Sequence, residues 1–421
     1  MIDLRPFRAL HYEPRAAGAL GDVIAPPYDV IDAAQLERLY ARSPFNVVRL
    51  ILNRSPDRYT AAAADLADWR ARGILVQDRT PCLYFYVQDF ALADGSPHQR
   101  SGVLAAVRLQ PFSAGNILPH ERTFPSAKAD RLRLMTACRA NLSPIFGIYP
   151  AAGGALTPVR ALAESSAAWI DVEDGGERHR VWRLAEPILV APLIDALRAQ
   201  TVFIADGHHR YETALTYREH RHAAGDTDAD APHNFLLMYL CAMDDPGLLV
   251  LPTHRLWRGP FDESAWARVS ASFAFQPGAA SELPARLATA APGAIGLHTP
   301  TRSGLLRVTD RSAVERTLAD LAPIIRPLEV TLLDAFLLSQ VLGIDCVRAG
   351  QDGQLSYTHD DRHALATVGR DGISAAFLLP APRMADVAAA CLAGQTMPQK
   401  STYFFPKLQS GLVFHLLDAD V

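Results

Sequence analysis

One short stretch in the middle of the chain constrains its local structure more than any other. Residues 201–205 are apolar (T-V-F-I-A) and run directly into D-G-H-H-R at residues 206–210. Behind this turn, Tyr211, Ala214 and Leu215 recur at helical spacing. An apolar run of strand length, a polar turn with a glycine and a helical pattern predict a buried strand that passes directly into a helix.

The D-G-H-H-R turn has the chemistry of an anion site. Free N–H groups at a helix start bind anions, and the helix dipole reinforces them. Gly207 lets the backbone approach a ligand closely, and Arg210 can grip phosphate oxygens in bidentate fashion. Asp206 can cap the helix, hold Mg²⁺, or do both at different stages. The alternative is that Asp206 is only an N-cap and that His208 and His209 are solvated; the unbroken polar run after a buried strand favours the functional interpretation.

Zinc is disfavoured at the paired histidines. Neighbouring residues at a helix start point apart, and the chain has no H-E-x-x-H motif. The 5 cysteines are scattered and form no C-x-x-C pair. This pattern also argues against a thiolate zinc site and a disulfide framework.

A second signal is His120-Glu121 within L-P-H-E-R-T-F-P, residues 118–125. A loop carboxylate beside histidine and arginine can act as a general base. Taken alone, this segment is explained as well by a surface salt bridge. Tyr28, Asp29 and Arg255 are minor candidates for substrate contacts, and such residues are more often structural.

A third signal lies near the C-terminus, where Lys400, Ser401 and Thr402 are followed by Lys407. Lysine with two hydroxyl groups suits phosphate recognition. The G-x-x-x-x-G-K frame of a Walker A motif is missing. The alternative is that K-S-T merely closes a strand, with Lys400 in water.

The elements along the chain predict four segments. They are an N-terminal α/β segment (1–110), a catalytic core (111–260), a helix-rich insertion (261–345) and a C-terminal α/β segment with K-S-T (346–421). Within them, strands are expected at 47–52, 83–90, 103–109, 143–149 and 364–368, a helix after an Asp32 cap, and another helix at 384–392.

Composition narrows the class of protein. The chain has 421 residues, 49% of them hydrophobic and 20% charged, which is ordinary for globular proteins. The net charge of −4 disfavours a nonspecific nucleic-acid partner. Charges begin at Asp3, no signal-peptide core follows, and no apolar run approaches the ~18 residues of a membrane span. We therefore expect a cytoplasmic protein without a membrane partner; the sequence sets no oligomeric state.

Four motifs together resemble the domain-of-unknown-function family numbered 1015. They are I-A-P-P-Y-D-V-I (24–31), P-H-E-R-T-F-P (119–125), A-D-G-H-H-R-Y-E (205–212) and M-P-Q-K-S-T-Y-F-F-P-K (397–407). The D-G-H-H-R element also resembles the ParB/sulfiredoxin-like fold of free-serine kinases. The resemblance implies a mixed α/β fold with a ParB/sulfiredoxin-like core and additional N- and C-terminal α/β segments. It also implies a phosphotransferase that converts free L-serine to O-phosphoserine.

The resemblance assigns roles to particular residues. An upstream glutamate is the base in those kinases, and D-G-H-H-R handles phosphates and metal. Here Glu121 matches that base, with His120 beside it as a substrate contact, and Asp206 matches the Mg²⁺ ligand. Phosphate contacts fall to Gly207, His208, His209 and Arg210. The K-S-T motif has no counterpart in the shorter kinases, so Lys400, Ser401, Thr402 and Lys407 are assigned to the donor on chemical grounds alone.

The phosphoryl donor and two other functions stay open. No Gly-rich nucleotide loop is present, which favours pyrophosphate over ADP or ATP. A ParB-like DNA clamp would need a helix-turn-helix and a basic face, and neither is evident in the sequence. A regulatory module that binds nucleotide or phosphate without turnover is the third alternative.

Overall fold

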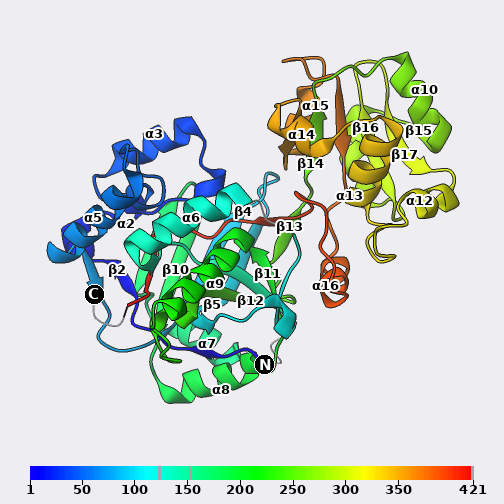
Figure 1. The fold of residues 1–421 in the computed structure, drawn as a ribbon. Helices are drawn as coiled ribbons and strands as arrows, with labels where there is room; N and C mark the ends of the chain where they lie inside the picture. The colour runs from blue at the N-terminus through cyan, green and yellow to red at the C-terminus, as the bar shows by residue number, and fades with distance from the viewer. Residues whose placement is uncertain (122–124, 151–153, 419–421) are drawn as a thin grey trace. The chain divides into compact units, whose positions relative to one another are not determined.

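The computed structural model describes residues 1–121, 125–150 and 154–418 (Figure 1). The chain forms two compact units. Unit 1 comprises Met1–Pro119, Thr123–Leu249 and Pro406–Val421, and unit 2 comprises His120–Arg122 and Val250–Phe405. This grouping differs from the four predicted segments, because strands from both sides of residue 345 pair in one sheet of unit 2. The predicted mixed α/β class is confirmed.

Unit 1 is built on one mixed sheet. In the described residues, 9 strands form it in the order β6-β11-β8-β12-β5-β4-β10-β9, with β1 beside β5. The pairs β6–β11 and β8–β12 are parallel and the other pairs are antiparallel. The strands are β1 (Leu4–Arg5), β4 (Leu83–Ala91), β5 (Pro97–Arg108), β6 (Ile117–Pro119), β8 (Ile145–Tyr149), β9 (Ile170–Asp174), β10 (Glu177–Leu184), β11 (Val202–Asp206) and β12 (Phe235–Ala242). Two small pairs join β2 (Leu10–Tyr12) to β3 (Leu75–Gln77) and β7 (Ala140–Asn141) to β21 (His415–Leu416).

Helices cover the apolar face of this sheet. Buried side chains of α7, α8 and α9 pack on the sheet's main core, and α6 lies along α9 (Figure 1). A second apolar cluster holds the N-terminal helices together with the end of the chain. The helices of unit 1 are α1 (Pro14–Ala17), α2 (Leu20–Val23), η1 (Tyr28–Val30), α3 (Ala33–Arg42), α4 (Val48–Ile51), α5 (Arg58–Ala71), η2 (Phe112–Ala114), α6 (Pro125–Cys138), α7 (Thr157–Ser165), α8 (Pro187–Arg198), α9 (His208–Ala223) and η3 (Pro232–Asn234).

The N-terminal helices confirm one local prediction and correct another. The Asp32 side chain accepts a hydrogen bond from the Gln35 amide at 2.7 Å and caps α3 as expected. The predicted strand at 47–52 is instead the short helix α4, whose first turn is fixed by a bond from the Val48 amide to Asn46 Oδ1 at 2.9 Å. Apart from Arg49, the residues of α4 are apolar and buried, and a short apolar run cannot distinguish helix from strand.

On the face opposite the main core, β4 and its neighbours carry a group of polar side chains. Along β4, Leu83, Phe85 and Val87 enter the main core, while the alternate residues face the opposite way. On that opposite face, Tyr84 donates to Asp78 at 2.7 Å and Tyr86 is hydrogen-bonded to His179 Nδ1 at 2.9 Å. Gln88 Nε2 donates to the carbonyl of Lys407 at 3.1 Å. Tyr84, Tyr86 and Gln88 of β4 therefore bind polar groups rather than the main core.

Glu177, which lies on the same face of the sheet as Tyr86 and His179, predicts a pH-dependent stability. Burial raises the pKa of Glu177 to about 7, although Arg100 favours its ionised form. The stability that the protonated carboxyl provides is present below the unfolded value of 4.5 and is lost as the pH rises to about 7. At pH 8, the free energy of unfolding of Glu177→Gln should therefore be about 2–3 kcal/mol higher than that of the wild type. At pH 4 the wild type and Glu177→Gln should have the same free energy of unfolding. Chemical denaturation at both pH values measures this difference, and equal stability of the two proteins at pH 8 would contradict the prediction.

Unit 2 contains a separate antiparallel sheet. In its described residues, 6 strands lie in the order β15-β17-β16-β19-β14-β18, and β13 pairs with β20 outside that sheet. The strands are β13 (Leu249–Leu251), β14 (His254–Trp257), β15 (Phe273–Pro277), β16 (Ala294–His298), β17 (Ser303–Val308), β18 (Leu355–Thr358), β19 (Ala375–Leu378) and β20 (Tyr403–Phe405). The helices are α10 (Glu263–Ser272), η4 (Ala280–Glu282), α11 (Leu283–Ala288), α12 (Arg311–Thr317), α13 (Glu329–Thr331), the π-helix η5 (Leu332–Val341), α14 (Cys346–Gln351), α15 (Asp361–Ala366) and α16 (Met384–Leu392).

The segment 261–345 holds several helices, and β15, β16 and β17 also lie within it and supply half of the sheet. One expectation for unit 2 was wrong. The predicted strand at 364–368 falls largely on α15, which begins where the Asp360 side chain accepts a bond from the His363 amide at 3.0 Å. The helix at 384–392 is confirmed as α16.

Candidate functional site

The predicted strand–turn–helix lies in unit 1. Strand β11 ends at Asp206 and α9 begins at His208, with Gly207 as the N-cap residue. Gly207 has a φ of +93°, a conformation that glycine adopts without strain. A Cβ there would also lie 3.0 Å from the Arg210 guanidinium. The predicted capping role of Asp206 is wrong, because Gly207 holds the cap position and no side chain caps α9.

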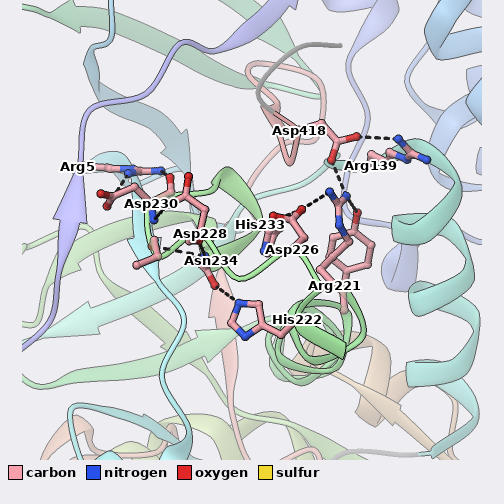
Figure 2. Close-up of polar contacts among 12 residues, drawn as sticks. Arg5, Arg139, Arg221, His222, Asp226, Asp228, Asp230, His233, Asn234 and Asp418 are labelled. Carbon is pink, nitrogen blue, oxygen red and sulfur yellow. Dashed lines mark hydrogen bonds and ion pairs between the residues drawn. The ribbon is translucent and has the colours of Figure 1, made fainter. Parts of the chain in front are cut away.

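The opposite end of α9 is tied to the end of the chain (Figure 2). Arg221 donates to Asp418 at 2.6 Å, and Arg139, which follows α6, donates to the same carboxylate at 3.0 Å. His222 Nε2 is hydrogen-bonded to Asn234 Oδ1 at 2.9 Å. These bonds fix the helix whose first turn carries His208, His209 and Arg210.

The Asp206 side chain lies between two cations. Lys407 Nζ donates to Oδ1 at 2.5 Å and Arg210 donates to Oδ2 at 2.6 Å. The side chains of Asp206, Lys407 and Arg210 are only 15%, 14% and 12% exposed. Burial alone would raise the pKa of Asp206, but the charges of Lys407 and Arg210 outweigh it and hold that pKa well below its usual range. We call these three residues the Asp206 centre; its carboxylate is ionised at neutral pH.

Two buried side chains hold the backbone that carries Lys407. Arg100 donates to the carbonyl of Pro406 at 2.6 Å, and Gln88 donates to the carbonyl of Lys407. Arg100 also donates to Gln88, and both side chains are fully buried. Sequence reasoning missed this pair. The signal available was a glutamine within the otherwise apolar run L-Y-F-Y-V-Q, residues 83–88.

The first motif contributes Tyr28 to the same unit. Its ring lies under the Arg131 guanidinium, 4.1 Å from the ring centre. Tyr28, Arg131 and Arg210 line one cavity of about 50 Å³, together with Asn141 and Ser143. Asp29 is exposed on η1, whereas His208 is buried and His209 half-buried on α9.

In unit 2 the structure brings together two motifs that the sequence treated separately. The Ser401 amide donates to Glu121 Oε1 at 3.3 Å, and His120 Nε2 is hydrogen-bonded to Thr402 Oγ1 at 2.7 Å. The Met397 amide donates to the His120 carbonyl at 2.8 Å. Residues far apart in sequence thus fix the loop that carries Glu121. The remainder of the second motif, residues 122–124, lies outside the described residues.

Lys400 has an unusual backbone conformation. Its φ is +57°, a left-handed value that is uncommon for a residue with a side chain. Arg255 donates to the Lys400 carbonyl at 3.3 Å while pairing with Asp334 of η5 at 2.8 Å. Arg255, predicted as a substrate contact, is fully buried and takes a structural role in this arrangement. The Lys400 side chain is exposed.

The donor set at Asp206 does not fit a resident Mg²⁺. Each carboxylate oxygen faces a cationic nitrogen, and Mg²⁺ requires near-octahedral oxygen ligands. Throughout the described part of the chain, no group of three or more His, Cys, Asp or Glu side chains is arranged to hold a metal. The assignment of Mg²⁺ to Asp206 stays a prediction that this arrangement does not support.

Comparison with known proteins gives the family. The family model described as "Protein of unknown function (DUF1015)" matches residues 4–331. The chain belongs to this family. A search of curated proteins found no match. In this DUF1015 chain the first and third motifs lie in unit 1, while the second and fourth each cross from one unit to the other.

Solved structures give a remote likeness. A mutant free serine kinase in complex with ADP is 12% identical, and the match covers 74% of the DUF1015 chain and 92% of that chain at a TM-score of 0.39. A free serine kinase in complex with AMP is 12% identical over 74% and 91% at a TM-score of 0.36. A conserved hypothetical protein from Pyrococcus furiosus is 14% identical over 75% and 95%, also at 0.36. The ParB/sulfiredoxin-like core stays a prediction. No helix in the described ranges is long and apolar enough to cross a membrane.

Proposed function

We propose that this DUF1015 protein is a cytoplasmic phosphotransferase that transfers a phosphoryl group to the hydroxyl of free L-serine, with pyrophosphate as donor and O-phosphoserine as product. The observation that carries the proposal is the convergence of Lys407 and Arg210 on Asp206 at the start of α9. Phosphoryl transfer depends mainly on positioning and on neutralising negative charge.

The Asp206 centre has an excess of one positive charge. Within these three residues, the cations Lys407 and Arg210 share the carboxylate of Asp206. A guanidinium and an ammonium are the side chains that most often bind phosphate oxygens. In the proposed reaction, Arg210, Lys407 and the first amides of α9 bind the donor; Mg²⁺ brought by the donor would neutralise part of its negative charge.

The second part of the proposal concerns the acceptor. Glu121 is the proposed general base for the serine hydroxyl, and His120 is a proposed substrate contact. The amide of Ser401 and the hydrogen bond between His120 and Thr402 hold this pair in place. A base must be held within hydrogen-bond reach of the proton that it removes, so a fixed loop supports this role.

The direct test is product formation by the full-length protein. The protein is incubated with Mg²⁺ and isotopically labelled L-serine plus pyrophosphate, ADP or ATP in separate reactions. Mass spectrometry then measures labelled phosphoserine. Product with pyrophosphate supports the whole proposal, and product only with a nucleotide corrects the donor. Absence of product with every donor would overturn the phosphotransferase and leave a phosphate-binding regulatory role.

Lys400 carries a separate prediction about the donor. Its ammonium is a point charge that a polyanionic donor can recruit, and losing a charged hydrogen-bond partner costs ~1.5–3 kcal/mol. Lys400→Ala should therefore weaken the apparent donor affinity roughly 10- to 150-fold. The apparent affinity for serine should change far less. Lys400→Gly, which also suits the left-handed backbone, should behave like Lys400→Ala; donor affinity unchanged in both variants would show that the lysine is only a solvated side chain.

A further inference from the structure

We infer that Lys407 occupies the cation position of the Asp206 centre, so that a protein ammonium stands where a resident divalent metal would otherwise bind. This inference concerns the protein before any substrate binds, and it holds or fails whether or not the protein phosphorylates serine. It changes the cofactor expectation, because the chain then has no stored Mg²⁺ at Asp206.

The geometry around the carboxylate carries the first step. Lys407 Nζ lies 2.5 Å from Asp206 Oδ1, and Mg²⁺ binds carboxylate oxygens at about 2.0–2.1 Å. A metal ion bound to Oδ1 from the same side would therefore overlap the ammonium. The other oxygen is taken by Arg210 at 2.6 Å. A divalent ion would also be repelled by two cations in a largely buried site, where charges are poorly screened.

The second step is that Lys407 is held in place. Arg100 and Gln88 donate to the two successive carbonyls of Pro406 and Lys407. Both donors are fully buried, on the face of β4 and β5 opposite the main core. The backbone at Lys407 is therefore anchored, and removing the ammonium from Asp206 would require the side chain alone to swing away and leave the carboxylate beside Arg210.

A similar pair in unit 1 provides a matched control. Lys128 donates to Glu212 at 2.6 Å, and their side chains are 35% and 26% exposed. Both are more exposed than Lys407 and Asp206. Removing Lys128 should therefore leave a hydrated carboxylate rather than an enclosed one, and no tight metal site should appear.

The experiment measures Mn²⁺ binding, with Mn²⁺ as a paramagnetic probe for Mg²⁺. Free Mn²⁺ is followed by electron paramagnetic resonance in titrations of full-length protein without serine or phosphate. The wild type should bind no Mn²⁺ through Asp206, so the Mn²⁺ titrations of Asp206→Asn and of the wild type should be the same. Lys407→Ala should gain one site at least roughly tenfold tighter than any wild-type site, because the repelling ammonium is gone. The gain should vanish in Lys407→Ala/Asp206→Asn and should be missing in Lys128→Ala.

Two results would overturn the inference. One is a wild-type Mn²⁺ site that is lost in Asp206→Asn, since the carboxylate would then bind metal despite the lysine. The other is a folded Lys407→Ala protein that gains no site. If Lys407→Ala does not fold, Lys407→Gln takes its place, and the wild-type comparison with Asp206→Asn decides by itself. Because no substrate is present, these outcomes are independent of the serine phosphorylation assay.

Discussion

Asp206→Asn is expected to abolish turnover and to lower the free energy of unfolding by about 3 kcal/mol. Breaking a buried ion pair by removing one partner costs about 3–5 kcal/mol, because the remaining charge is left without compensation. Here Lys407 and Arg210 would both lose their common carboxylate. The asparagine oxygen can still accept one hydrogen bond, so we expect the lower end of this range. The loss of a helix cap would cost only ~1 kcal/mol, but Asp206 is not the cap.

Urea denaturation and the phosphoserine assay measure the two effects. Glu212→Gln is the control, since it neutralises a half-exposed partner of Lys128 and should change stability by less than about 1 kcal/mol. The pKa of Asp206 is depressed in the folded protein, so its stabilising effect is present above its unfolded pKa and is lost as the pH falls through the folded value. The stability difference between wild type and Asp206→Asn should therefore shrink in acid. A variant as stable as the wild type at pH 7 would show that the two cations do not depend on this carboxylate.

Glu121→Gln should reduce turnover by ~10²–10⁴-fold while the protein stays folded. Glutamine keeps the shape of the side chain and an oxygen that can accept the Ser401 amide, but it cannot take a proton from serine. The loop should therefore keep its hydrogen bonds, and the melting temperature should change little. Steady-state kinetics with the best donor of the assay, together with a thermal melt, measure the two quantities.

The matched control for this variant is Glu263→Gln. Glu263 is a largely exposed glutamate of unit 2 that pairs with Arg302. The substitution therefore removes the same charge from the same unit without changing the His120-Glu121 loop. Its turnover should equal that of the wild type. If Glu121→Gln had the turnover of the wild type, Glu121 would have only a structural role, as the acceptor for the Ser401 amide.

Local structure was predictable wherever neighbouring residues decide it. The apolar run at 201–205 became β11, the D-G-H-H-R turn led directly into α9, and Asp32 capped α3. These features depend on side-chain periodicity and turn chemistry over a few residues. The strand prediction for residues 47–52 was wrong for the same reason, because a short helix that is buried on nearly all sides shows no helical periodicity in its sequence.

The sequence by itself determined the strand–turn–helix, the family motifs and the side chains that we propose to be chemically active. Only the tertiary structure decided which of them meet: Lys407 pairs with Asp206 across 201 residues, and Ser401 binds Glu121 across 280. The same contacts changed the role of Asp206 from a helix cap to the counter-ion of two cations. The physical reason is that a buried charge must be compensated by whichever group the folded backbone brings to it. The backbone at Lys407 is placed by Gln88 of β4 and Arg100 of β5. The spacing of these residues in the sequence does not predict that placement.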